Sequence, residues 1–315
     1  MTANHPVHVA VGVILNAGNE VLISFRHPNS HQGGLWEFPG GKVEENETLL
    51  HALDREFQEE LGIRVNEAFP LLRCHYDYED KSVLLDVWEI VEYEGDAVGR
   101  EGQEIAWCSI ADLAARDFPA ANLPIIRCLQ LPRVIAITPE LDSRQAFVSC
   151  IEHLVAQEVD AIQVRQKYLQ ADEYKEWFQL ATDIVDNRNV PLICNAELQT
   201  ALELEARGIH LTSSQLMALE ARPVSENTLL STACHDLAEL RHAETIRADL
   251  ALLSPVASTS KYAADKLLGW QQFLSLRKQV SLPVVALGGL RRENFELARQ
   301  HGAFGIAGIQ MFSPG

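Results

Sequence analysis

Residues 41–63 read GKVEENETLLHALDREFQEELGI, and this stretch decides the fold of the first part of the chain. Thr48 is a favourable residue for the N-cap of a helix, and Gly62 is typical of the C′ position, where a helix ends. Between the two, apolar residues recur at steps of three and four: Leu50, Leu53, Phe57 and Leu61. This spacing predicts an amphipathic helix with one buried stripe.

Glu56, Glu59 and Glu60 stand at positions i, i+3 and i+4 of the same segment and therefore share a face of the predicted helix. Carboxylates packed this closely repel one another. A divalent cation removes that repulsion, and Mg²⁺ takes oxygen ligands of this kind, usually together with substrate phosphates. Arg55 can brace the cluster as a fixed fork of donors. A solvated acidic helix face is the alternative, but the fixed offsets to a preceding glycine pair and to Glu47 favour a metal site.

This stretch resembles the signature of the Nudix hydrolases, which cleave nucleoside diphosphates linked to another moiety. Every fixed position matches, and Phe57 stands where the family usually has an aliphatic residue. The surrounding fragments LWEFPGGK (35–42), GREGQE (99–104) and DFPAANLPII (117–126) are similar to the MutT branch of the family, which hydrolyses oxidised guanine nucleoside triphosphates such as 8-oxo-dGTP. This similarity runs from Val7 to Leu131.

The resemblance implies a site built from these segments. A divalent cation, Mg²⁺ with Mn²⁺ as the alternative ion, would be bound by Gly40, Glu56, Glu59, Glu60 and Glu101. The four glutamates and Arg55 would be the catalytic residues. The nucleotide would be contacted by Arg26, His31, Glu37, Phe38, Pro39, Gly40, Lys81 and Asn122. Water would attack the β-phosphorus, releasing pyrophosphate and a nucleoside monophosphate, and the identity of the general base stays open.

Three of these residues allow a simpler interpretation. The amide of Asn122 can offer both a donor and an acceptor to the modified purine, and Phe38 can offer a ring for stacking. Alternatively, Asn122 caps the last helix of this part and Phe38 lies in the core, while Arg26 is a surface residue. Lys81 stands where the family has arginine, so the charge is kept and the planar fork is lost.

The composition describes an ordinary globular protein. A length of 315 residues predicts two domains, and a net charge of −18 argues against polymeric nucleic acid as a partner but allows a small nucleotide bridged by metal. Residues 1–131 contribute −13 of this charge, from 9 Lys+Arg and 22 Asp+Glu, and the rest contributes −5. No apolar stretch long enough for a membrane helix occurs, and the six scattered cysteines indicate reduced thiols in the cytoplasm. The oligomeric state is not indicated.

The first part alternates strand-like and helical segments. His8–Leu15 and Val21–Phe25 flank a turn and predict a hairpin. Further strands are predicted at 71–78, 83–91 and 105–109, and a helix is predicted at 122–131. For residues 1–131 we therefore expect an α/β/α sandwich of the Nudix type with a mixed sheet.

The second part begins at Pro132, which ends the preceding helix, and β and α segments then alternate. The expected strands are 134–138, 161–165, 191–194, 208–211, 229–233, 250–253, 283–287 and 304–307. The longest expected helices are 143–157 and 172–187. Eight strands with helical crossovers predict a (β/α)8 TIM barrel over residues 132–315, with the last helix truncated.

The barrel is similar to thiamine-phosphate synthase and its TenI-like tautomerase relatives. The resemblance implies a phosphate or ligand site made of Gln163, Arg165, Lys167, Asn195, His235, Lys261, Gly288, Gly289 and Gly308. The synthase has a metal-binding aspartate where this chain has Ala196, and a second where residues 212–215 (TSSQ) contain none. Because neither alanine nor glutamine replaces a carboxylate on Mg²⁺, we expect no Mg²⁺-dependent synthase activity.

The leading hypothesis is a Mg²⁺-dependent hydrolase that removes 8-oxo-dGTP from the nucleotide pool and so limits DNA damage. In the second hypothesis the hydrolase acts instead on a pyrophosphate of the thiamine pathway. The barrel could bind a thiamine phosphate and regulate the hydrolase, act as a tautomerase through His235, or be a structural partner only.

Overall fold

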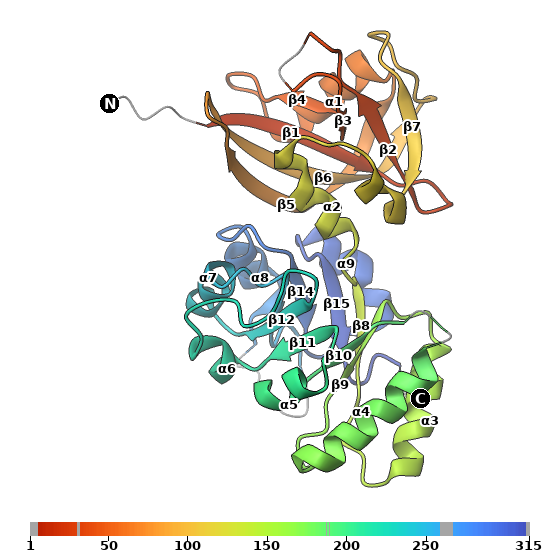
Figure 1. The fold of residues 1–315 in the computed structure, drawn as a ribbon. Coiled ribbons are helices and arrows are strands. Elements are labelled where there is room, and N and C mark those ends of the chain that lie inside the picture. Colours follow the sequence, from red (N-terminus) through yellow and green to blue (C-terminus); the bar gives the residue numbers. More distant parts are fainter. Residues whose placement is uncertain (1–5, 30–31, 187, 189, 259–266, 313–315) are drawn as a thin grey trace. The chain divides into compact units, whose positions relative to one another are not determined.

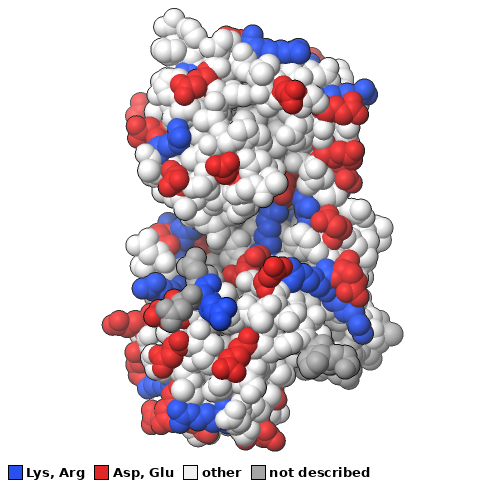
Figure 2. Space-filling view, turned by 90° about the vertical axis from the view of Figure 1, so that its right-hand side faces the viewer, with Lys and Arg blue, Asp and Glu red and all other residues white. Residues whose placement is uncertain are grey.

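The computed structural model describes residues 6–29, 32–186, 188, 190–258 and 267–312, and the chain forms two compact units, Met1–Leu131 and Pro132–Gly315 (Figure 1). Both are α/β, as predicted. No helix among the described residues is long and apolar enough to cross a membrane. On the face drawn in Figure 2, acidic side chains are scattered over both units with basic ones among them.

Unit 1 contains two sheets with helices packed on them. The larger sheet is mixed, and its strand order is β4 (Gly40–Lys42), β1 (Val7–Ile14), β6 (Ser82–Glu94), β5 (Arg64–Asp77). Only β1 and β6 run parallel in it. The smaller, antiparallel sheet has the order β3 (Trp36–Glu37), β2 (Glu20–Phe25), β7 (Ile105–Ser109). The helical segments are α1 (Leu49–Glu60), η1 (Ile110–Ala115), η2 (Ala120–Asn122) and α2 (Leu123–Leu129).

The predicted hairpin between the first two strands is wrong. They meet only at a single antiparallel bridge, Leu15 to Val21, and then enter different sheets. Strand β1 already has β4 on one edge and β6 on the other, and β2 lies between β3 and β7. Pairing between β1 and β2 therefore stops at the bridge beside the turn, since the rest of each strand is paired within its own sheet.

Helix α1 has the predicted ends and packs against the larger sheet. The Thr48 hydroxyl accepts a hydrogen bond from the His51 N–H at 3.4 Å, and Gly62 follows the helix with φ +74°. The Phe57 ring lies directly over Gly12, since a Cβ there would come within 2.2 Å of the ring. A residue larger than glycine at position 12 would therefore push the helix off the sheet.

The buried stripe of α1 differs from the prediction at one position. Leu53, Phe57 and the C-cap residue Leu61 are fully buried, whereas Leu50 is 47% exposed. In the first turn the core is contacted by Leu49 instead, which lies one residue, or about 100°, around the helix from Leu50.

Unit 2 is a closed barrel of eight parallel strands, as predicted. The strands are β8 (Val134–Ile137), β9 (Ala161–Val164), β10 (Leu192–Cys194), β11 (Gly208–Leu211), β12 (Leu229–Cys234), β13 (Leu250–Leu253), β14 (Val284–Leu287) and β15 (Gly305–Gly308). Strand β15 pairs with β8 and closes the ring. Each strand therefore directs its carboxyl end to the same rim of the barrel.

Helices follow the strands around the barrel (Figure 1). They are α3 (Arg144–Val155), α4 (Ala171–Val185), α5 (Leu198–Glu203), α6 (Ser213–Met217), α7 (Leu237–Thr245), α8 (Gly269–Arg277), η4 (Arg292–Asn294) and α9 (Phe295–Gln300). Residues 309–312, the described part after β15, contain no helix.

Replacing Phe57 by alanine should destabilise unit 1 by about 3–5 kcal/mol, because the ring is fully buried and leaves a cavity. Leu50→Ala is the matched control on the same helix, and its exposed side chain should cost within about 0.5 kcal/mol. Hydrogen exchange of peptides from residues 7–109 under increasing urea measures the free energy of unfolding of unit 1 separately from that of unit 2. Equal losses of stability in the two variants would contradict the assigned packing.

Candidate active site

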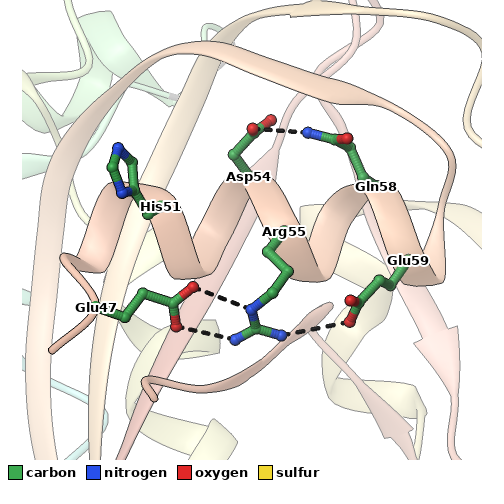
Figure 3. Close-up of a pocket in the computed structure, with 6 residues that line it drawn as sticks. All are labelled: Glu47, His51, Asp54, Arg55, Gln58 and Glu59. Atoms are coloured by element: carbon green, nitrogen blue, oxygen red, sulfur yellow. Dashed lines mark hydrogen bonds and ion pairs between the residues drawn. The ribbon is translucent and has the colours of Figure 1, made fainter. Parts of the chain in front are cut away.

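Arg55 lies at the centre of the acidic face of α1 (Figure 3). Its guanidinium donates to both carboxylate oxygens of Glu47 at 3.0 Å, to Glu56 at 2.8 Å and to Glu59 at 3.3 Å. It also donates to the carbonyl oxygen of Lys42 at 2.9 Å. The predicted brace is thus formed, and it joins the helix to the segment that precedes it.

The depression drawn in Figure 3 is on the outer side of this helix. It is lined by Glu47, His51, Asp54, Arg55, Gln58 and Glu59. Glu59 is more than half exposed, whereas the side chains of Glu56 and Glu60 are largely buried and are absent from this lining. The predicted cluster is therefore divided, with Glu59 outside and the other two turned towards the glycine pair.

Glu56 and Glu60 contact the glycine pair that precedes the helix. A Cβ on Gly41 would lie 2.1 Å from the Glu56 carboxyl carbon, so that carboxylate rests directly on the glycine. Glu60 accepts a hydrogen bond from the Gly40 N–H at 3.4 Å. The absence of side chains at these two positions is what allows both carboxylates to approach the backbone.

Burial, followed by repulsion from Glu37, Glu56 and Glu101, raises the pKa of Glu60 to about 8. Its one favourable contact, the Gly40 N–H, does not offset this. Several carboxyl groups thus lie close together at this point of the fold. Arg26 pairs with Glu37 and Arg55 pairs with Glu56, whereas Glu60 is held by the Gly40 N–H. Hard oxygen donors with excess negative charge suit Mg²⁺.

No three His, Cys, Asp or Glu side chains in the described part of the chain are gathered closely enough to hold a metal by themselves. This is compatible with the donor set, because Mg²⁺ usually takes only one or two protein carboxylates and completes its coordination with water and substrate phosphates. The residues present therefore fit the ion, and their roles as ligands stay a prediction.

The loop that carries Glu101 is fastened to the end of α1. The Val98 N–H donates to Leu61, and the Arg100 N–H and the Gln103 amide both donate to the Glu60 carbonyl oxygen at 2.9 Å. Gln103 also accepts from the Glu101 N–H at 2.9 Å. Glu101 itself is exposed. The sequence did not identify Gln103 as the anchor, because its partner is 43 residues away.

Arg26 and Glu37 form an ion pair between β2 and β3. Burial raises the pKa of Glu37 to about 7, although the charge of Arg26 opposes this. The structure therefore brings Arg26 into the site instead of leaving it on the surface. Pro39 is buried and accepts a hydrogen bond from the Gly12 N–H at 2.9 Å.

Asn122 and Phe38 lie together at the end of this site. The Asn122 side-chain oxygen accepts from the Phe38 N–H at 3.4 Å, and the amide makes no capping hydrogen bond to α2. The ring of Phe38 is only 3% exposed and stacks on Phe118, with centroids 5.6 Å apart. The expectation that this ring is open for stacking is therefore wrong, because Phe118 already covers it.

Tyr78, which the sequence did not single out, lies beside Asn122. Its hydroxyl is hydrogen-bonded to the backbone of Ala121, and burial raises its pKa. The Tyr78 N–H donates to the carbonyl oxygen of Lys81 at 2.8 Å, which places Lys81 in the β5–β6 turn near this site. His31 lies outside the described residues.

Polar side chains also meet at the carboxyl ends of the barrel strands. The Gln163 amide donates to Asn195 at 3.1 Å, and Asn195 donates to the carbonyl oxygen of His210 at 3.3 Å. Burial, together with the charge of Arg165, lowers the pKa of His210 to about 3, so this imidazole is neutral. The Gln163 side-chain oxygen is buried, and none of the described residues forms a hydrogen bond with it.

The remaining predicted residues of the barrel differ in their contacts and in their exposure to solvent. Arg165 is paired with Glu140 at 2.9 Å. His235 is exposed, and its Nδ1 contacts the carbonyl oxygen of Ser254 at 2.8 Å, so it is not a core residue. Gly288 and Gly289 have φ of +105° and +68° after β14, and Gly308 ends β15. Lys261 lies outside the described residues.

The barrel residues do not fit the metal that the synthase resemblance implies. Ala196 offers no side-chain ligand. The Gln215 side chain is occupied in a capping box with Thr212, with its oxygen 2.8 Å from the Thr212 N–H, and its amide donates to the Ala196 carbonyl oxygen at 3.0 Å.

Known proteins resemble the two units separately. A family model described as NUDIX domain matches residues 10–128, and one described as Thiamine monophosphate synthase matches residues 134–312. The chain is 40% identical over 124 residues to the 8-oxo-dGTP diphosphatase of Escherichia coli, covering 39% of this chain and 96% of that protein.

The chain is also 29% identical over 184 residues to a putative thiamine-phosphate synthase 2 of Aquifex aeolicus, covering 58% of this chain and 99% of that protein. A solved structure from a study of MutT from Aliivibrio salmonicida and Vibrio cholerae is 39% identical, with a TM-score of 0.35, and the match covers 39% of this chain and 96% of that one. Both resemblances predicted from the sequence are confirmed.

Gly41→Ala should lower the kcat/KM of nucleoside triphosphate hydrolysis by about 100-fold, because the new methyl group displaces the Glu56 carboxylate. Stability should change little, since φ of Gly41 is not in the left-handed region and the clash is with a movable side chain. Steady-state kinetics and thermal denaturation measure the two effects. Gly18→Ala, in an exposed turn, is the control, and unchanged kinetics in Gly41→Ala would contradict the assigned contact.

Proposed function

We propose that this chain, which belongs to the Nudix family through residues 10–128 and to the thiamine monophosphate synthase family through residues 134–312, hydrolyses 8-oxo-dGTP to 8-oxo-dGMP and pyrophosphate with the help of Mg²⁺. It is a Nudix pyrophosphohydrolase. The 40% identity to an 8-oxo-dGTP diphosphatase supports the finer choice of substrate. The observation that carries the proposal is the position of the Glu56 and Glu60 carboxyl groups directly against the Gly40–Gly41 backbone. Glu37 and Glu101 are further carboxyl groups close enough to raise the pKa of Glu60.

The candidate ligands of Mg²⁺ are the Gly40 carbonyl oxygen and Glu56, Glu59, Glu60 and Glu101, of which the ion would take one or two carboxylates. The chemistry it would supply when bound is neutralisation of charge on the phosphates. Arg55 keeps Glu56 and Glu59 in place through its hydrogen bonds. One of the four carboxylates takes the proton of the attacking water. The water oxygen bonds to the β-phosphorus, the bond from that phosphorus to the α–β bridging oxygen breaks, and the nucleoside monophosphate leaves.

Asn122 is proposed to read the oxidised base. Its side-chain oxygen is oriented by the Phe38 N–H, and an amide oxygen has a second lone pair for a donor on the purine. The amide N–H groups can donate to a purine oxygen. Because Phe118 covers the Phe38 ring, Phe38 contributes through its backbone, which holds the amide, and not as a stacking surface.

The partner of this site is a free nucleotide, and we place the activity in the cytoplasm. The net charge of −18 disfavours polymeric nucleic acid, and none of the six cysteines is in a disulfide. The second candidate is hydrolysis of a thiamine-pathway pyrophosphate, which the family of the barrel favours. Comparing turnover of 8-oxo-dGTP, dGTP and a pyrimidine pyrophosphate separates the two. Preferred turnover of the pyrimidine compound would replace the first proposal.

Glu60→Gln should lower hydrolysis by at least about 100-fold at saturating Mg²⁺, because it removes a charge that the metal or the attacking water needs. The circular dichroism spectrum should be unchanged. Glu45→Gln, an exposed residue near the same helix, makes the same change in net charge and should leave the rate unaffected. Near-normal turnover of Glu60→Gln would reject the assigned role.

Asn122→Ala should lower the ratio of kcat/KM for 8-oxo-dGTP to that for dGTP by about 10- to 100-fold, the effect of losing hydrogen bonds to one base only. Turnover of dGTP should change little. Asn66→Ala is the control, since the Asn66 amide bonds to Glu94 on the neighbouring strand. If both substrates lose activity equally, Asn122 is not the residue that reads the base.

A further inference from the structure

Two loops at the carboxyl ends of neighbouring barrel strands are fastened together. They are residues 138–141, after β8, and 165–167, after β9. The Thr138 hydroxyl oxygen accepts from the Arg165 N–H at 2.9 Å and from the Gln166 amide at 3.1 Å. The Gln166 oxygen accepts from the Leu141 N–H at 3.0 Å, and Gln166 is only 3% exposed. The position of the intervening Glu140 is therefore fixed by its neighbours.

The Glu140 carboxylate uses both of its oxygens in this setting. One accepts from the Arg165 guanidinium at 2.9 Å, and the other accepts from the Lys167 backbone N–H at 3.0 Å. The side chain of Arg165 is 19% exposed and that of Glu140 is 30% exposed, and Glu140 as a whole is an exposed residue. A guanidinium beside a backbone N–H is a donor pair suited to two oxygens of a phosphate. Here a carboxylate of the same chain fills that pair.

We propose that Glu140 is a built-in anion that occupies the Arg165–Lys167 donor pair and excludes phosphate-bearing ligands from this part of the barrel. A phosphate at the same donors would lie within a few ångströms of the Glu140 carboxylate, and like charges at that separation repel each other. The exclusion does not depend on the hydrolase reaction, so its test is independent of the proposed function.

Two further observations agree with a site that does not take a diphosphate. The positions where the synthase resemblance places metal ligands are Ala196 and the Gln215 region, and Gln215 is occupied by Thr212 and Ala196. The carboxylates near these positions, Glu197 and Glu239, already accept hydrogen bonds from the Gln215 amide and from the Ser213 hydroxyl and the His235 N–H. The buried oxygen of Gln163, to which no described residue donates, calls instead for a hydrogen-bond donor. The ligand class that fits is a small molecule that offers N–H or O–H groups and carries no phosphate at Arg165.

The simpler alternative is that Glu140 only fastens the two loops. Glu140→Gln separates the two roles, because the amide oxygen can still accept a hydrogen bond while the negative charge is lost. A fastening role predicts no change in phosphate affinity. The exclusion role predicts a gain, and that gain must depend on Arg165.

The test is isothermal titration of the full chain with inorganic phosphate, in EDTA so that no divalent metal contributes. Glu140→Gln should bind phosphate about 10- to 100-fold more tightly than the unaltered chain, the usual size of one coupled charge interaction. Adding Arg165→Gln should abolish the gain. Glu173→Gln, an exposed acid in the first turn of α4, makes the same change in net charge and should have no effect.

Equal affinity in the unaltered chain and in folded Glu140→Gln overturns the proposal, as does a gain that persists without Arg165. Circular dichroism checks folding. If Glu140→Gln does not fold, Glu140→Ala is the second variant, and the same gain in affinity is expected.

Discussion

The close approach of helix α1 to the backbone beneath it is the constraint on which unit 1 depends. At one end of the contact the Phe57 ring covers Gly12, and at the other the Glu56 carboxylate rests on Gly41. At both points a side chain on the glycine would occupy the space of the helix residue. The same contact therefore fixes the core packing and the position of the acidic side chains, which places the site on a rigid element.

This close approach also brings carboxylates near one another, and Arg55 relieves their repulsion only in part. Arg55 neutralises the outer side of the helix, where it contacts Glu47, Glu56 and Glu59. On the inner side Glu60 has only one backbone N–H, and its neighbours are other carboxylates. Such an arrangement costs stability unless a cation or a substrate-bound metal relieves it. Electrostatic strain of this kind is characteristic of functional sites.

The second unit shows that its fold and the contacts of the side chains at its strand ends are separate matters. The barrel has eight parallel strands and belongs by sequence to the thiamine monophosphate synthase family. Yet Gln215 is committed to a capping box, and Arg165 is paired with Glu140. The same barrel fold can carry different side chains at its strand ends. Function in this unit therefore follows from local partners and not from the architecture.

By itself the sequence determined the elements and their chemistry. The cap at Thr48, the stop at Gly62 and the eight strand-like segments of the second part are local signals, because periodicity and turn residues report on neighbouring positions. Only the tertiary structure decided which elements meet. It divided β1 and β2 between two sheets, covered the Phe38 ring with Phe118 and paired Arg165 with Glu140. Such partners come from segments that are far apart in the sequence and meet by packing. The local sequence pattern of one segment therefore does not predict which other segment it contacts.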